Sequence, residues 1–222
     1  MPRPFKLIET VNTAVGPLEL HQRGDRDFMI LDRGQVLMTT VIQSSEIELG
    51  QAACTLVRDR KRVRVLIGGL GLGFTLRAAL DNLPQDAEVV VAELNEVVVK
   101  WCRGPLAELT GQSLADPRVQ VIVGNVGHVI RDAQRPFDAI IWDLYRGPAG
   151  RESGRLDPLY GTASLQRTHR ALSDEGVFAV WGETPDPSFS ARLEQCGFSV
   201  KQTRSSGKGP KHALYLAIRQ SR

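Results

Sequence analysis

The fold of this chain of 222 residues is decided by one stretch, Val63-Arg64-Val65-Leu66-Ile67-Gly68-Gly69-Leu70-Gly71-Leu72-Gly73-Phe74. A short apolar run ends there in four glycines within six residues, and residues 75–80 then read as the start of a helix. Strand, tight glycine-rich turn and helix form the first β-α unit of a nucleotide-binding α/β domain. The glycines let the backbone pass close to a ligand, and a helix N-terminus favours polar or anionic groups.

The spacing of the glycines narrows the class of nucleotide. A dinucleotide fingerprint needs G-x-G-x-x-G, whereas the turn here is G-x-G-x-G, with Phe74 where the third glycine would fall. That form is more typical of S-adenosylmethionine (SAM) domains. A second strand over residues 88–92 ends at Glu93, whose carboxylate suits a bidentate hydrogen bond to ribose hydroxyls. The alternative is a glycine-rich turn without a nucleotide. The predicted cofactor-binding residues of this unit are Gly69, Gly71, Leu72, Gly73 and Glu93.

Composition limits the class of protein. The length and an apolar content of 42% suit one sizeable domain with a small appendage. A net charge of +3 does not by itself call for a nucleic-acid partner. The three cysteines are scattered, which favours reduced thiols in a cytoplasmic protein. The four histidines do not cluster, so no metal site is expected. The chain has no long apolar run, so we expect neither a signal peptide nor a membrane helix.

The N-terminal part predicts a small antiparallel β element. Residues 18–20, 28–31 and 35–38 read as short strands, and the first two are separated by a turn signal at residues 23–25. A helix is predicted to run from Ser44 and Ser45 to Val57, with Glu48 at a capping-box offset from Ser45. The predicted division is a small β element with its linking helix over residues 1–55, and a SAM-binding domain over residues 56–222.

The rest of the chain alternates strands with helices. Strands are predicted at residues 119–123, 137–143, 176–181, 198–201 and 213–218, and helices at residues 95–109, 126–133, 159–172 and 188–195. This order predicts an α/β fold: a Rossmann-like class I SAM-methyltransferase sheet of seven strands, the last one antiparallel. Asp143 is the last residue of the predicted strand over residues 137–143, at the end where ligands bind in open α/β sheets. Asn125 follows another strand and could bond an adenine edge. Residues 144–155 read as a polar lid.

Two basic segments allow a different interpretation. Residues 58–64 and 204–211 could together form a nucleic-acid face. The first segment has no interleaved aromatic side chains and leads directly into a strand, which favours a solvated helix end. Nucleic-acid binding is therefore not favoured.

An ordered set of motifs between roughly residues 28 and 185 resembles the spermidine synthase-like aminopropyltransferases. The motifs are Val41-Ile42-Gln43-Ser44-Ser45-Glu46, the turn Gly68–Gly73, Glu93, Asp116-Pro117-Arg118-Val119, Gly124-Asn125, Asp143 with Gly147-Pro148 after it, Leu159-Tyr160, and Gly182-Glu183. In that family a small N-terminal β domain precedes a SAM-type domain, and dimers are common.

The resemblance implies a role for each matching residue. Gln43 would touch the nucleoside donor, and Glu93 would hold its ribose. Asn125 stands where the family usually has an aspartate near adenine. Asp143 matches the acid that deprotonates the acceptor amine, and Glu183 matches an acid close to the acceptor pocket.

Three residues depart from the family pattern, and the departures concern both the donor and the acceptor. Leu72 stands where the family has an aspartate that binds the aminopropyl ammonium of decarboxylated SAM, and Arg146 lies where a second acid would help to hold the polyamine. Trp181 replaces a glutamine. An ammonium buried without its carboxylate is costly. Leu72 with Phe74-Thr75 resembles the turn of the putrescine N-methyltransferases, which use SAM itself.

The sequence therefore leads us to expect a SAM-dependent methyltransferase that acts on a small acceptor, with an amine favoured. Asp143 is the expected base, and Tyr145 or Glu183 would orient the acceptor. One alternative is an aminopropyltransferase that uses decarboxylated SAM. A second is a non-catalytic SAM-binding or RNA-associated module. A cytoplasmic homodimer with no membrane contact is expected.

Overall fold

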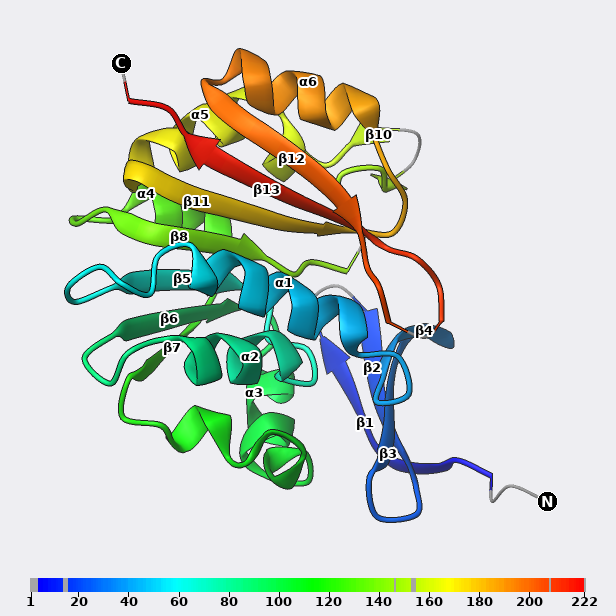
Figure 1. Ribbon diagram of the computed structural model, residues 1–222. Helices are drawn as coiled ribbons and strands as arrows, with labels where there is room; N and C mark the ends of the chain where they lie inside the picture. Colours follow the sequence, from blue (N-terminus) through cyan, green and yellow to red (C-terminus); the bar gives the residue numbers. More distant parts are fainter. Residues whose placement is uncertain (1–3, 14–15, 146, 153–154, 208, 222) are drawn as a thin grey trace.

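A computed structural model describes residues 4–13, 16–145, 147–152, 155–207 and 209–221. Figure 1 shows a small N-terminal sheet beside a larger sheet that is covered by helices on both faces. The larger sheet has the strand order β12-β13-β11-β8-β5-β6-β7. Its strands are β5 (Arg64–Gly68), β6 (Glu88–Glu93), β7 (Val119–Val123), β8 (Phe137–Trp142), β11 (Leu172–Gly182), β12 (Phe198–Arg204) and β13 (Ala213–Arg219).

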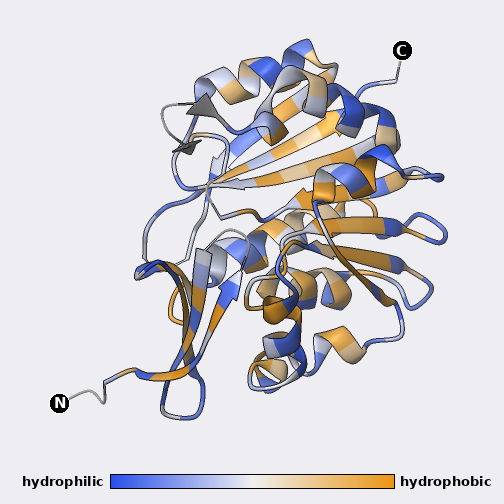
Figure 2. Cartoon of the chain, turned by 180° about the vertical axis from the view of Figure 1, so that it is seen from behind, coloured by the Kyte–Doolittle hydropathy of each residue, from blue (hydrophilic) through white to orange (hydrophobic). Residues whose placement is uncertain are grey.

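The pairing of these strands confirms the predicted fold class. β7, β6, β5, β8 and β11 run parallel to one another, while β13 is antiparallel to both β11 and β12. The central strands are continuous apolar runs because both faces of a parallel sheet are buried. Figure 2 shows these strands as the hydrophobic centre of the molecule, with hydrophilic colour on the outer helices.

Alternate residues of each central strand point into two separate cores. Val65, Ile67 and Ile141 pack against α1 (Ser44–Thr55), α2 (Phe74–Asn82) and α3 (Glu96–Arg103). Leu66 and Ile140 pack on the other face against α4 (Val126–Arg131), α5 (Thr162–Ala171) and α6 (Pro187–Gln195). This follows from the two-residue period of a strand. The short elements are η1 (Ala107–Thr110), η2 (Ser113–Ala115), η3 (Pro158–Tyr160), β9 (Arg151–Glu152) and β10 (Arg155–Leu156).

The N-terminal sheet consists of four antiparallel strands in sequence order. They are β1 (Lys6–Thr13), β2 (Gly16–Arg23), β3 (Asp27–Asp32) and β4 (Gln35–Thr39). The sequence indicated short strands over residues 1–45 but did not single out β1 as one of them. Leu18, Leu20, Phe28 and Ile30 are at most 3% exposed and belong to the core that contains α1, α2 and α3. The N-terminal sheet is therefore packed onto the larger unit.

Several predicted element ends differ from the structure. The expected helix over residues 95–109 ends at Arg103, because the following Gly104-Pro105 disfavours helical backbone and lacks one N–H donor. The expected helix over residues 159–172 is divided at Gly161 into η3 and α5. The predicted lid lies partly outside the described residues, and its described part contains the paired strands β9 and β10.

The capping box predicted at the start of α1 does not form. Gln43 occupies the N-cap position without a side-chain cap bond, and Ser45 Oγ donates instead to Glu46 Oε2 at 2.7 Å. Glu48 accepts hydrogen bonds from Ser206 N and Gly207 N, far along the chain. Glu48 therefore forms a tertiary contact with Ser206 and Gly207 in place of the expected capping box with Ser45.

The described residues include no helix with the length and apolar character that a membrane span requires. Nor do they contain a group of three or more His, Cys, Asp or Glu side chains that could hold a metal ion. Cys54, Cys102 and Cys196 are free thiols.

Candidate active site

A cleft of about 820 Å³ lies at the carboxyl ends of β5, β6 and β8. This is the edge at which ligands bind in open α/β sheets. Leu37 and Met38 of β4 line its opposite side, so the N-terminal sheet completes the cleft. Six predicted site residues contribute to its lining: Gly69, Gly71, Glu93, Asn125, Asp143 and Tyr145.

The glycine turn is shaped by two close approaches. Gly69 has φ 87°, and a Cβ there would lie 2.3 Å from the backbone oxygen of Asp143. Gly71 has φ 54°, and a Cβ there would lie 2.7 Å from Met38 Sδ. Only glycine combines these backbone angles with this proximity. Cys102 supports the turn from behind by donating from Sγ to the Gly71 carbonyl at 3.2 Å.

Glu93 is held rigidly at the wall of the cleft. Its side chain is 7% exposed, Oε2 accepts from Leu70 N at 2.8 Å, and Oε1 accepts from Asn95 N at 2.8 Å. Burial raises the pKa of Glu93, and the backbone hydrogen bonds oppose that shift. The carboxylate thus has a defined orientation, as recognition of a ribose diol requires.

Asn125 caps α4 and lines the same cleft. Its Oδ1 accepts from Gly127 N at 2.8 Å. The amide oxygen of Asn125 is thus used to cap the helix. Its amide nitrogen is the group that can donate a hydrogen bond to a ligand.

Asp143 lies between the glycine turn and α1. Thr75 Oγ1 donates to Asp143 Oδ2 at 2.5 Å, and the same hydroxyl lies 3.3 Å from the Glu46 carbonyl oxygen. Burial, followed by the negative charge of Glu46, raises the pKa of Asp143 to about 7, while the hydrogen bond from Thr75 opposes the shift. A carboxylate with a pKa near neutrality is suited to accept a proton at that pH.

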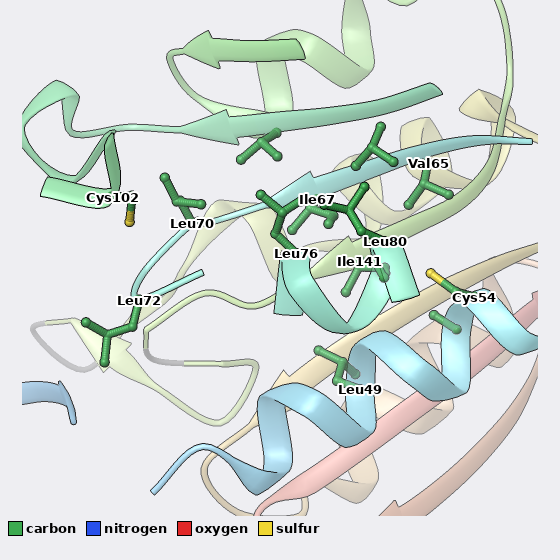
Figure 3. Close-up of a cluster of buried hydrophobic side chains, with 14 of the residues drawn as sticks. Leu49, Cys54, Val65, Ile67, Leu70, Leu72, Leu76, Leu80, Cys102 and Ile141 are labelled. Atoms are coloured by element: carbon green, nitrogen blue, oxygen red, sulfur yellow. The ribbon is translucent and has the colours of Figure 1, made fainter. Parts of the chain in front are cut away.

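Two further pockets adjoin the cleft and share Leu37, Met38 and Tyr145 with it. One of about 440 Å³ is lined by Leu37, Met38, Glu46, Leu70, Gly71, Leu72, Phe74, Asp143, Leu144, Tyr145 and Trp181. The other, of about 1260 Å³, includes Glu46, Tyr145, Trp181, Glu183, Pro210 and His212 in its lining. Figure 3 shows Leu72 on the turn, apart from the side chains packed between α1 and α2.

The structure does not bring every predicted site residue to these pockets. In the described part of the chain, Gln43 and Gly73 are absent from the lining of all three pockets. Gly73 is the N-cap of α2 and packs towards Thr110. Arg146 lies outside the described residues. Glu46, which closes the family motif at residues 41–46 and was given no role of its own, lines two of the pockets. The position of Glu46 in the first turn of α1, close to the predicted site residue Gln43, was the feature of the sequence that could have indicated this.

The basic segments are largely engaged within the molecule. Arg60 donates to Asp138, Ser173 and the Glu175 carbonyl, and Arg64 donates to Glu88. These contacts favour a structural role for the first segment. In the second segment, Lys211 Nζ donates to the carbonyls of residues 206 and 207.

Comparison with known families identifies the chain. The spermine/spermidine synthase domain matches residues 49–190, which is more than half of the sequence. The chain belongs to this family.

Two curated relatives of this spermine/spermidine synthase family member are named polyamine aminopropyltransferase. The polyamine aminopropyltransferase of Clostridium tetani is 31% identical over 122 residues, covering 55% of this chain and 41% of the relative. That of Thermotoga petrophila is 32% identical over 155 residues, covering 70% and 48%. The chain therefore spans less than half the length of these relatives.

Solved structures agree on the fold. Spermidine synthase from Thermotoga maritima superposes with a TM-score of 0.72 at 19% identity, covering 96% of this chain and 72% of that one. A spermidine synthase in complex with the transition-state analogue AdoDATO gives a TM-score of 0.71, also at 19% identity. At this level of identity the likeness extends to the fold alone.

The expectation of a SAM-dependent methyltransferase is wrong. The matching family is that of spermine and spermidine synthases, and the curated relatives are named polyamine aminopropyltransferases. That expectation rested on the missing carboxylate at Leu72. The pocket beside Leu72 nevertheless contains two carboxylates, those of Glu46 and Asp143, so one apolar substitution does not make it neutral.

Proposed function

We propose that this protein transfers an aminopropyl group from decarboxylated SAM to a primary amine of a small polyamine. The observation that carries the proposal is the position of Asp143, which joins a nucleoside-sized cleft to a pocket with a second carboxylate. Family membership supports the reaction class. The residues proposed for the donor are Glu93 at the ribose and Asn125 at the adenine.

The reaction needs alignment and the removal of one proton. The acceptor nitrogen attacks the aminopropyl carbon bonded to sulfur. A carbon–nitrogen bond forms, and the carbon–sulfur bond breaks with its electron pair remaining on sulfur. The products are 5′-methylthioadenosine and the extended amine. A protonated amine has no lone pair to attack with, so Asp143 takes one proton from it before transfer. The sulfonium is already an activated leaving group, so the protein's other task is to hold the two reactants in line.

Tyr145 and Glu183 are proposed to contact the acceptor. Tyr145 lines all three pockets, and Glu183 lines the 1260 Å³ pocket that opens from the same region. A carboxylate and a phenol at these positions suit an alkylammonium chain.

The test is product analysis. The purified protein is incubated with decarboxylated SAM and 1,4-diaminobutane, 1,3-diaminopropane or a triamine, and products are identified by mass spectrometry. We expect 5′-methylthioadenosine in equal amount to an amine that has gained one aminopropyl unit. SAM in place of the decarboxylated donor should give no methylated amine. Absence of an aminopropylated product across the panel would contradict the proposal.

A further inference from the structure

We propose that Glu46 is a second functional carboxylate of the active site, which together with Asp143 binds a primary alkylammonium group in the pocket beside Leu72. This inference rests on the proposed function, because it assigns a binding residue to the same reaction. It was suggested by the placement of Glu46 in the folded chain, where it lines the pocket that contains Asp143 and the pocket that contains Glu183.

The first argument is the composition of the pocket walls. Leu70, Leu72, Phe74 and Leu144 are apolar, and Leu72 is only 4% exposed. Among the described residues that line this pocket, none is a lysine or arginine. Two carboxylates in such surroundings repel each other and lose hydration. A bound cation relieves both costs.

The second argument is that Glu46 is held in place. Trp181 Nε1 donates to Ser45 Oγ at 3.2 Å, and Ser45 Oγ donates to Glu46 Oε2 at 2.7 Å. Ser45 is 1% exposed, so the hydroxyl at the centre of this relay is shielded from water. A buried donor chain that ends on a carboxylate orients it, which reduces the entropy lost when a ligand binds.

The third argument concerns the other partners of this carboxylate. Among the described residues, Glu46 forms no ion pair with a lysine or arginine, whereas Glu9, Glu88 and Asp116 all do. Glu46 and Asp143 line the same pocket, and the negative charge of Glu46 contributes to the raised pKa of Asp143. Thr75 lies between them, near the Glu46 backbone and bonded to Asp143. The available counter-ion for this pair is therefore a ligand.

The ammonium has two possible sources, the aminopropyl arm of the donor and the acceptor amine. Both carry the same chemical group, and Glu46 borders the pockets in which each would lie. The test therefore uses two pairs of ligands that differ by one ammonium. The first pair is decarboxylated SAM and its analogue whose S-propyl arm lacks the terminal amine. The second pair is 1,4-diaminobutane and 1-aminobutane, titrated in the presence of 5′-methylthioadenosine.

Affinities are measured by calorimetry for the wild-type protein, Glu46→Gln and the control Glu96→Gln. Glu96 is also an acid in the first turn of a helix, but it lies outside the three pockets. We expect Glu46→Gln to weaken binding of the ligand with the additional ammonium at least tenfold in one pair, the range for a hydrogen bond to a charged group. Binding of the matched ligand should change less than twofold, and Glu96→Gln should behave as wild type.

The pair that responds identifies the source of the ammonium. An equal effect of Glu46→Gln on both members of each pair, or no effect, would overturn the proposal, as would a wild type that does not discriminate within either pair. If Glu46→Gln does not fold, Glu46→Asp retains the charge on a shorter side chain and should weaken only the ammonium-bearing ligands. Glu46-dependent binding in a protein that makes no aminopropylated amine would reject the proposed function and leave this inference standing.

Discussion

Asp143 illustrates how one residue can be costly for stability and useful for chemistry. Its pKa is raised to about 7 by burial and by Glu46, which means that the folded state disfavours the ionised form. The contribution of Asp143 to stability is therefore fully present below its ordinary pKa near 4 and is lost as the pH rises through 7.

We predict that Asp143→Asn is more stable than wild type at pH 8, by on the order of 1–2 kcal/mol, and differs little at pH 4. The same variant should bind the donor nucleoside but lose activity by about 10²-fold or more, because an amide cannot accept the proton. Urea unfolding at both pH values and single-turnover assays would measure these effects. Asp25→Asn in an exposed turn is the matched control. Full turnover by Asp143→Asn would remove this residue from the role of base.

Glu93 is the residue on which donor recognition should depend most. Both of its carboxylate oxygens accept hydrogen bonds from backbone amides at the edge of the cleft. We predict that Glu93→Ala weakens nucleoside binding by about 1.5–3 kcal/mol, the value of a hydrogen bond to a charged group. Titration with 5′-methylthioadenosine measures this without turnover. Glu96→Ala, three residues further along the chain, should leave the affinity unchanged. An unaltered affinity in Glu93→Ala would rule out the ribose assignment.

At the scale of elements, α1 is joined to the connection between β12 and β13 by one side chain. Glu48 accepts from Ser206 N, Ser206 Oγ and Gly207 N, and the same connection brings Pro210 and His212 to the 1260 Å³ pocket. Helix and loop are thereby coupled on the side where the acceptor is proposed to enter.

We predict that Glu48→Ala accelerates hydrogen exchange of the Ser206 and Gly207 amides on the order of tenfold. The KM for the amine should rise while the affinity for 5′-methylthioadenosine stays constant, because the loop does not line the 820 Å³ cleft. Exchange measured by mass spectrometry, together with steady-state kinetics, provides the two readouts. Glu108→Ala, at an exposed position far from this loop, is the control. If Glu48→Ala weakened the binding of 5′-methylthioadenosine as much as that of the amine, the loop would not act on the acceptor alone, and this prediction would be wrong.

At the scale of the whole molecule, the N-terminal sheet is part of the site. Leu18, Ile30, Leu37 and Met38 line the cleft opposite the glycine turn. The division at residues 55 and 56 stays a prediction, but α1 contacts α2 and β11 extensively. We therefore expect ligand binding in the cleft to depend on how the N-terminal sheet packs on the larger unit.

We predict that Met38→Ala weakens binding of both nucleoside and amine, by about 1 kcal/mol each, because the side chain lines all three pockets and covers Gly71. Met29→Ala on the neighbouring strand β3 should lose comparable stability without a loss of affinity. Calorimetry and thermal unfolding of both variants separate the two effects. If Met38→Ala and Met29→Ala bound the nucleoside and the amine equally well, the N-terminal sheet would contribute to stability but not to ligand binding.

The sequence alone was sufficient for the fold class and for the edge of the sheet at which the site lies. Apolar runs, the G-x-G-x-G turn, and acids at the carboxyl ends of strands are local patterns. Glu93 is the last residue of β6, and Asp143 directly follows β8. The ends of α3 and α5 were misplaced where Gly104-Pro105 and Gly161 interrupt apolar spacing.

Only the tertiary structure decided which charges share a pocket. Glu46 and Asp143 are almost a hundred positions apart in the chain, and the sequence motifs that contain them did not indicate that the two side chains line one pocket. The inference of methyl transfer relied on a single side chain, Leu72. The charge that a ligand meets is instead the sum over all walls of a pocket, and it depends on through-space distance and on the exclusion of water. Those two quantities exist only once the N-terminal sheet, α1 and the carboxyl ends of the strands have come together.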